Sequence, residues 1–132
     1  MRHAMKIVVI DDEKNLLASL DTLLSSLGHS VSTSSSGEHG IALAQSVMPD
    51  VVICDISMKG GVNGYGVVRW LRLNENFAKT FIVALSGNNQ QEDYEKSLQA
   101  GFDRHIAKPT SLEKLHMLMD DAWRHKVRNL TL

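Results

Sequence analysis

Five short runs of β-forming residues, separated by longer segments, restrict the fold more than any other feature of this sequence. Four of the runs are continuously apolar rather than alternating, a pattern typical of strands buried on both faces of a parallel sheet. The remaining run, HSVSTS, is more polar and gives a weaker signal. We therefore expect five parallel strands, which begin near Lys6, His29, Val51, Thr80 and Arg104.

The segments between these runs carry the helical period. The clearest one places six leucines between Leu16 and Leu27 on one side and ends at Gly28, a residue suited to the left-handed conformation after a helix. Further helices are expected over about 38–47, after Gly64, over about 90–100, and after Ser111 as N-cap. The expected inward side chains of these helices are Ile41, Ala44, Val47, Val67, Val68, Leu71, Tyr94, Leu98, Leu112, Leu115, Met119 and Trp123.

Regular alternation of strand and helix predicts one α/β domain, with a doubly wound five-stranded parallel sheet and helices on both faces. A chain of 132 residues is too short for two such domains, so residues 1–132 are expected to form one. The expected core runs from about residue 5 to about residue 125 and is followed by a short polar tail. The cations near that end are expected to be a solvated helix end: Arg124, His125, Lys126 and Arg128.

Charge and composition argue against several classes of function. A formal net charge of -1, without a long run of Lys and Arg, gives no reason to expect direct DNA binding. Cys54 is the only cysteine and lies in an apolar run, so we expect a buried thiol and no internal disulfide. No apolar stretch is long enough to span a bilayer and the N-terminus does not resemble a signal peptide, so we expect a cytoplasmic protein.

Polar residues follow four of the predicted strands at the point where each ends. Asp11 and Asp12 follow the first strand, Asp55 the third, Ser86 the fourth and Lys108 the fifth. Because the carboxyl ends of parallel strands meet at one edge of a sheet, one site is expected there. Three carboxylates would repel one another unless a cation lies between them, and oxygen ligands favour Mg²⁺ over zinc. The six histidines show no paired zinc-ligand spacing.

A carboxylate in this setting can act as a nucleophile and carry a phosphoryl group. Lys108 adds a positive charge and Ser86 a hydroxyl donor, both suited to an anionic group on Asp55. Each piece also has a purely structural interpretation, because the acidic run at residues 11–13 can start a helix and the other residues can belong to turns. Their occurrence together at four strand ends favours a phosphoacceptor site.

This set of residues, in this order, resembles the receiver domain of bacterial two-component response regulators, and the resemblance covers nearly the whole chain. It implies a flavodoxin-like sheet with strand order 2-1-3-4-5. It also implies a signalling phosphoacceptor rather than an enzyme. The phosphoryl donor would be a histidine kinase or a His-phosphotransfer protein. The output partner would be a downstream protein or another domain of a parent protein.

The resemblance further implies roles for the residues around the acceptor. Asp55 would take the phosphoryl group, with Lys108 paired to it and Ser86 closing on it. Ser86 and a ring on the fifth strand would form the family's conformational switch. The ring position, three residues before Lys108, is His105 here, which is interpreted either as a half-buried structural residue or as a pH-sensitive switch. The peptide bond before Pro109 would be cis.

The resemblance also implies a metal site, with Mg²⁺ as the ion and Mn²⁺ as a substitute. Asp12 would be a direct ligand beside Asp55, Asp11 a ligand through water, and the backbone carbonyl of Ser57 a further ligand. The loop after Asp55 departs from the family pattern, because it carries Lys59 where proline is common and contains one extra residue.

Three other functions are considered. A magnesium-dependent phosphatase with an aspartyl-phosphate intermediate needs a carboxylate two residues after its nucleophile, where this chain has Ser57. A flavin mononucleotide carrier needs a phosphate-binding loop after the first strand, where the acidic residues 11–13 would repel phosphate. A phosphorylation-independent interaction module would have no use for the complete set of acidic residues and lysine.

Overall fold

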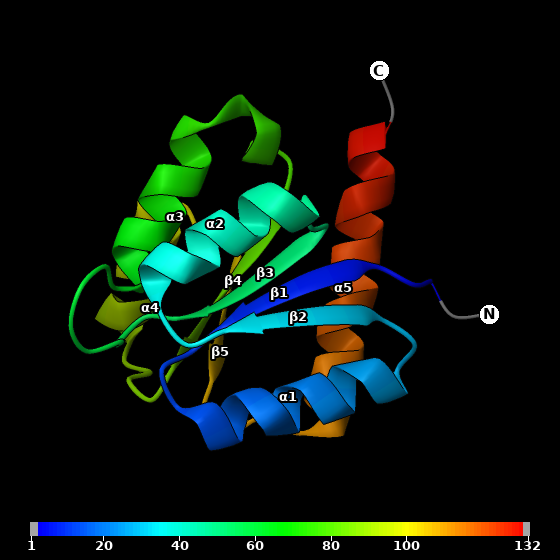
Figure 1. Cartoon of the computed structure of the whole chain (residues 1–132), viewed down its shortest axis with the longest axis horizontal. Coiled ribbons are helices and arrows are strands. Elements are labelled where there is room, and N and C mark those ends of the chain that lie inside the picture. Colours follow the sequence, from blue (N-terminus) through cyan, green and yellow to red (C-terminus); the bar gives the residue numbers. More distant parts are fainter. Residues whose placement is uncertain (1–2, 131–132) are drawn as a thin grey trace.

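A parallel sheet of five strands runs through the centre of the molecule in the order β2-β1-β3-β4-β5 (Figure 1). The computed structural model describes residues 3–130. The predicted α/β fold and strand order are confirmed, and each strand lies within about one residue of its expected position. The strands are β1 (Lys6–Ile10), β2 (Ser30–Ser34), β3 (Val51–Asp55), β4 (Phe81–Ser86) and β5 (Arg104–Ala107).

Helices cover both faces of the sheet, with α1 and α5 on one side and α2, α3 and α4 on the other (Figure 1). A single turn of 3₁₀ helix, η1, precedes β4. Within residues 3–130, no helix is both long and apolar enough to cross a bilayer. The helices are α1 (Lys14–Ser26), α2 (Gly37–Val47), α3 (Gly64–Leu73), η1 (Glu75–Phe77), α4 (Gln91–Ala100) and α5 (Leu112–Leu130).

The end signals in the sequence place the helix boundaries well. Gly28 has a φ of 95°, the left-handed conformation expected just after α1. The Ser111 hydroxyl accepts a hydrogen bond from the N–H of Lys114, as an N-cap does. Helix α2 ends before Met48, which adopts a left-handed φ of 53° ahead of Pro49. The residue before proline therefore leaves the right-handed helical region, as expected.

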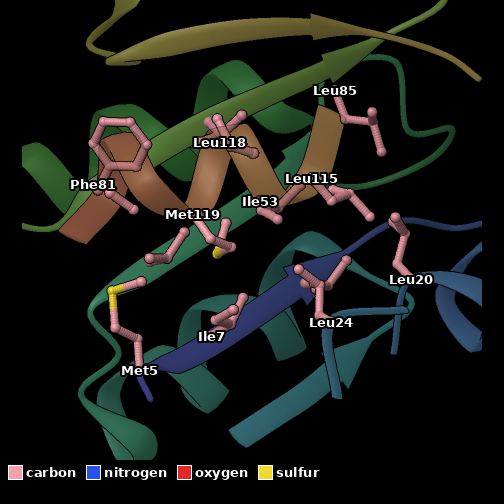
Figure 2. Close-up of a cluster of buried hydrophobic side chains, with 14 of the residues drawn as sticks. Met5, Ile7, Leu20, Leu24, Ile53, Phe81, Leu85, Leu115, Leu118 and Met119 are labelled. Carbon is pink, nitrogen blue, oxygen red and sulfur yellow. The ribbon is translucent and has the colours of Figure 1, made fainter. Parts of the chain in front are cut away.

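The central strands are apolar throughout because alternate side chains enter two separate cores. Figure 2 shows the core beneath α1 and α5, where Ile7 and Ile53 of the sheet meet Leu24 and Leu115 of the helices. The next residues along the same strands enter the second core beneath α2 and α3, and Cys54 is among them. Each fully buried aliphatic side chain contributes about 1.5–3 kcal/mol. Cys54 is a buried free thiol, as predicted, and its burial raises the pKa of the thiol.

Two of the expected inward side chains are exposed instead. Leu98 of α4 is 56% exposed, whereas its neighbour Ser97 is fully buried. The buried face of α4 is turned toward the polar His105 of β5, so a serine and not a leucine occupies it. Leu112 is 44% exposed at the first position of α5. The predicted apolar anchoring of α4 is therefore wrong at Leu98.

Helix α5 continues through the expected polar tail to Leu130, so the cations there lie at a helix end as predicted, but two of them are not simply solvated. His125 Nε2 lies 2.9 Å from the carbonyl oxygen of Lys79, and since a carbonyl only accepts, the ring donates this bond. Lys126 Nζ lies 3.1 Å from Oδ1 of Asp50. These contacts tie the end of α5 to segments next to the sheet, which a charge pattern alone does not reveal.

Candidate functional site

The carboxyl ends of β1, β3 and β5 bring together three of the predicted site residues. Asp55 is the last residue of β3, and the adjacent strand β1 leads directly into Asp11. Lys108 follows β5, and its Nζ lies 3.0 Å from Oδ2 of Asp11 and 3.4 Å from Oδ1 of Asp55. Asp11 is fully buried and Asp55 is 3% exposed. Two buried carboxylates therefore share one lysine.

Burial raises the pKa of Asp55, and the nearby Asp11 adds to the rise. A hydrogen bond of 3.1 Å from the Ser57 N–H to Oδ1 and the charge of Lys108 oppose it. Burial by itself would lower the pKa of Lys108, but the carboxylates of Asp11 and Asp55 outweigh it and raise that pKa. The lysine is therefore held as a cation beside a carboxylate of increased basicity.

Asp12 lies at the exposed edge of the same group. Carboxylate oxygens of Asp11, Asp12 and Asp55 all lie within 4.8 Å of one another. Oδ2 of Asp11 is buried and forms an ion pair with the Lys108 ammonium at 3.0 Å, without a further polar partner among the described residues. One lysine beside three clustered carboxylates leaves negative charge that a cation would balance. Oxygen donors of this kind fit a small hard cation such as Mg²⁺.

The helix-start interpretation does not account for Asp12. The N-cap of α1 is Glu13, whose side chain makes no capping hydrogen bond, and the first turn of the helix contains no acidic residue. Oδ1 of Asp11 accepts from the N–H of Glu13, but Oδ2 of Asp12 accepts from the distant N–H of Lys59 at 3.1 Å. Asp12 is thus turned toward the loop after β3.

The conformation of the loop after β3 could not be predicted from the sequence. Gly60 and Gly61 have φ values of 72° and 60°, so the extra residue is absorbed in a left-handed turn. The carboxylate of Glu38, from α2, accepts the N–H of Val62 at 3.0 Å. A Cβ on Gly61 would lie 2.5 Å from Oε1 of Glu38. Glu38 was not predicted, because its sequence position in α2 gives no sign of this contact.

Ser86 lies at the same sheet edge but its hydroxyl bonds within its own loop. Its Oγ donates to the carbonyl of Asn88 at 3.0 Å and accepts from the Asn88 N–H at 2.9 Å. The N–H of Lys108 donates to the Ser86 carbonyl at 2.9 Å, which connects β4 with the lysine. The Lys108–Pro109 peptide bond is cis, as expected. Ser57, the remaining predicted ligand, is exposed just after Asp55.

His105 lies farther along the edge and is half-buried between β5 and α4. Its Nδ1 lies 3.0 Å from Oγ of Ser97, and its Nε2 lies 3.1 Å from Oδ1 of Asn89. The ring also packs on Tyr94, with 4.2 Å between the ring centroids. Burial lowers the pKa of His105, although Asn88 and Asp93 oppose this. The sequence did not identify Asn89 or Ser97, since neither type of residue has a distinctive spacing.

The sequence matches one known protein family and several of its members. Residues 7–120 match the model of the response regulator receiver domain. The probable transcriptional regulator ycf27 of Guillardia theta is 36% identical over 110 residues, which are 83% of this chain but 42% of that protein. Protein PilG of Pseudomonas aeruginosa is 31% identical over 111 residues, which are 84% of this chain and 82% of that protein. The chain thus spans less than half of the length of ycf27 and most of PilG.

Solved structures agree on the architecture. The chemotaxis protein CheY4 of Vibrio cholerae superimposes with a TM-score of 0.85 over 91% of this chain and 99% of that one. The two sequences are 23% identical, so this likeness concerns the fold alone. A carboxyl-end site in a five-stranded sheet of this order is consistent with where such folds bind their ligands.

Proposed function

The chain belongs to the response regulator receiver domain family of two-component signalling, and from this premise we propose that Asp55 is the residue that accepts the phosphoryl group. The observation that carries the proposal is a nearly buried carboxylate beside a second buried carboxylate and a shared lysine. Burying negative charges next to one another destabilises the fold, and the raised pKa of Asp55 reflects this cost. Carboxylates with such perturbed pKa values cluster at functional sites.

The acidic group supports a divalent ion as the cofactor, with Mg²⁺ as the natural ion and Mn²⁺ as a substitute. Asp11, Asp12 and Asp55 each offer an oxygen to one position, and the carbonyl of Ser57 is the further ligand in this proposal. When bound, such an ion neutralises negative charge that develops on the transferring phosphoryl group. The clustering of three carboxylates around one lysine supports this assignment most directly.

In the proposed transfer, a carboxylate oxygen of Asp55 forms a bond to the phosphorus of a phosphohistidine. The phosphorus–nitrogen bond breaks, and the imidazole nitrogen keeps the electron pair. The raised pKa of Asp55 makes its carboxylate a better nucleophile while Lys108 keeps the opposite charge in place. The Ser86 hydroxyl, now bonded to the Asn88 carbonyl, rotates to donate to a phosphoryl oxygen. Ser86 and His105 are the proposed switch residues.

The donor in this proposal is a histidine kinase or a His-phosphotransfer protein, and the chain is a signalling phosphoacceptor of the cytoplasm rather than an enzyme. Some relatives are named as transcriptional regulators, and this chain covers less than half of the length of each of them. We expect the output to pass through contact with a downstream protein or a domain of a parent protein. A formal net charge of -1 favours neither DNA nor an anionic membrane as a direct partner.

The test is an intact-mass measurement after incubation with acetyl phosphate, with and without Mg²⁺. We expect a labile, Mg²⁺-dependent phosphoryl adduct on the wild type and none on Asp55→Asn, whose folded state is checked by circular dichroism. An adduct on Asp55→Asn would contradict the acceptor assignment. If the wild type shows no adduct and also fails to bind beryllofluoride, the phosphorylation-independent module becomes the better description.

A further inference from the structure

A chain of hydrogen bonds joins the loop after β4 to strand β5 and helix α4, and the proposed phosphoryl transfer does not require it. The side-chain amide nitrogen of Asn89 lies 3.3 Å from the carbonyl oxygen of Ser86. The amide oxygen of the same residue lies 3.1 Å from Nε2 of His105. On the other side of the ring, Nδ1 lies 3.0 Å from the hydroxyl of Ser97 in α4.

The chemistry of the partners fixes which atom donates in each bond. The carbonyl of Ser86 can only accept, so the Asn89 amide must present its NH₂ group to it. The oxygen of that amide is then left facing the ring, and an amide oxygen also only accepts. His105 must therefore carry a proton on Nε2. This conclusion follows from the arrangement of atoms alone.

Ser97 can bond to the His105 ring and can also release it, because its hydroxyl has a second acceptor nearby. Its hydroxyl lies 2.9 Å from the carbonyl of Tyr94, one turn earlier in α4, and it is fully buried. When Nδ1 of His105 carries no proton, the hydroxyl donates to the ring. If the ring moves away, the hydroxyl donates to the Tyr94 carbonyl instead. No buried donor is stranded in either arrangement, so the contact can open without the usual penalty of about 1–3 kcal/mol.

We propose that Asn89 is a positioning residue that ties the backbone of Ser86 to the ring of His105, so that movement at the acceptor site is transmitted to β5 and α4. The inference rests on the proposed function, because it assumes that Ser86 moves when Asp55 is occupied. Asparagine suits this place because one short amide both donates and accepts. An aspartate could accept from the ring but could not donate to Ser86, and an alanine could do neither.

The path continues onto the surface of α4 through Tyr94. Its ring packs on His105 at 4.2 Å between centroids, with an angle of 40° between their planes. Asp93, which precedes it, is the charged residue of α4 that acts on the His105 ring electrostatically. A shift of the ring would therefore move a face of α4 on which Leu98 is already exposed. Asn89 would thus set how strongly that face responds.

Nuclear magnetic resonance of the His105 side chain tests the proposal, with beryllofluoride and Mg²⁺ as the probe of the acceptor site. In the wild type we expect the Nε2–H form above the pKa of the ring, and a change of the ring resonances when the probe is added. In Asn89→Asp and Asn89→Ala, the backbone N–H of Ser57 should still respond to the probe, while the response of His105 is lost. Gln91→Ala is the matched control, because Gln91 is exposed and its side chain donates to Glu95 within α4.

Different outcomes test the role of Asn89 and the phosphoacceptor function of Asp55. An Nδ1–H form of His105 in the wild type would overturn the assignment of donors and the proposal with it. A His105 response of wild-type size in both Asn89 variants would show that the coupling bypasses this residue. If the probe leaves the Ser57 N–H of the wild type unchanged, the proposed phosphoacceptor function itself fails. Loss of the His105 response in Gln91→Ala would also overturn the specific role of Asn89.

Discussion

The acceptor half of the site and the α4 face are built from different interactions. The acceptor half, at the ends of β1, β3 and β5, consists of charged groups fixed by buried strands, with Asp11 fully buried and Asp55 at 3% exposure. The α4 face is joined to the rest of the domain by the neutral hydrogen bonds of Asn89, Ser97 and His105, beside an exposed loop. Charges on buried strands hold one geometry, whereas replaceable hydrogen bonds allow two. The acceptor half is therefore rigid, whereas the α4 face can adopt two arrangements.

Core truncations give the largest expected effect, and they compare α4, which carries the α4 face, with α5, which packs on the sheet. Leu115 of α5 is fully buried and Leu98 of α4 is 56% exposed. We expect Leu115→Ala to lower the free energy of unfolding by about 3 kcal/mol through lost contacts and a cavity. Leu98→Ala should change it by less than about 0.5 kcal/mol. Urea denaturation of both variants measures this, and equal losses would mean that Leu98 is packed as fully as Leu115.

This contrast also explains what the sequence could predict. The strands, the two cores and the charged residues were predictable because periodicity and strand ends depend only on local order. Leu98 was placed wrongly because a helix of weak amphipathic character does not reveal which side is polar. The contact between Glu38 and Val62 joins residues 24 positions apart. Such a contact exists only once α2 and the loop after β3 are both in place.

Removing the cation of the acceptor half should have the next largest effect on stability. Lys108→Ala leaves Asp11 and Asp55 facing each other without their shared ammonium. Because the lysine side chain is 25% exposed, we expect a loss of about 2 kcal/mol, less than the 3–5 kcal/mol that is typical of a fully buried pair. Mg²⁺ should restore more stability to this variant than it adds to the wild type.

Thermal unfolding with increasing Mg²⁺ measures this difference. Lys108→Met serves as a second variant, since it keeps most of the apolar length of the side chain. If Mg²⁺ stabilises the variants and the wild type equally, the lysine and the ion do not compensate the same negative charge. The description of the acceptor half as one charge-balanced group would then be wrong.

The loop after β3 combines both kinds of interaction. The charged side chain of Glu38, from α2, holds this exposed loop by a hydrogen bond. Glu38→Gln retains one acceptor oxygen for Val62, whereas Glu38→Ala removes it. We expect Glu38→Ala to lower the free energy of unfolding by about 1 kcal/mol. It should also weaken Mg²⁺ binding roughly 10-fold, since the N–H of Lys59 in this loop orients Asp12.

Isothermal titration calorimetry with Mg²⁺ checks the second part of that prediction, and Glu38→Gln should bind with nearly wild-type affinity. An affinity unchanged in both variants would show that the loop conformation does not depend on α2. The two glycines with left-handed φ would then be sufficient to set it.

The smallest expected effect is the pH dependence of the α4 face. Burial lowers the pKa of His105 below its ordinary value of 6.5, so the folded protein favours the neutral ring. As the pH falls below 6.5, the unfolded chain binds the proton first, and the stability due to the neutral ring is lost down to the lowered pKa. It is fully present above pH 6.5. The loss should be less than about 1 kcal/mol because solvent screens a half-buried ring.

The measurement is the difference in the free energy of unfolding between the wild type and His105→Gln as a function of pH. Glutamine keeps a donor for Asn89 but does not titrate, and the neighbours Asp93 and Tyr94 are common to both proteins. The wild type should lose stability relative to the variant between about pH 7.5 and pH 5, a range that extends at least about one pH unit to either side of 6.5. Parallel curves would mean that the ring has the same pKa in the folded and the unfolded protein. The surroundings of His105 would then not favour its neutral form.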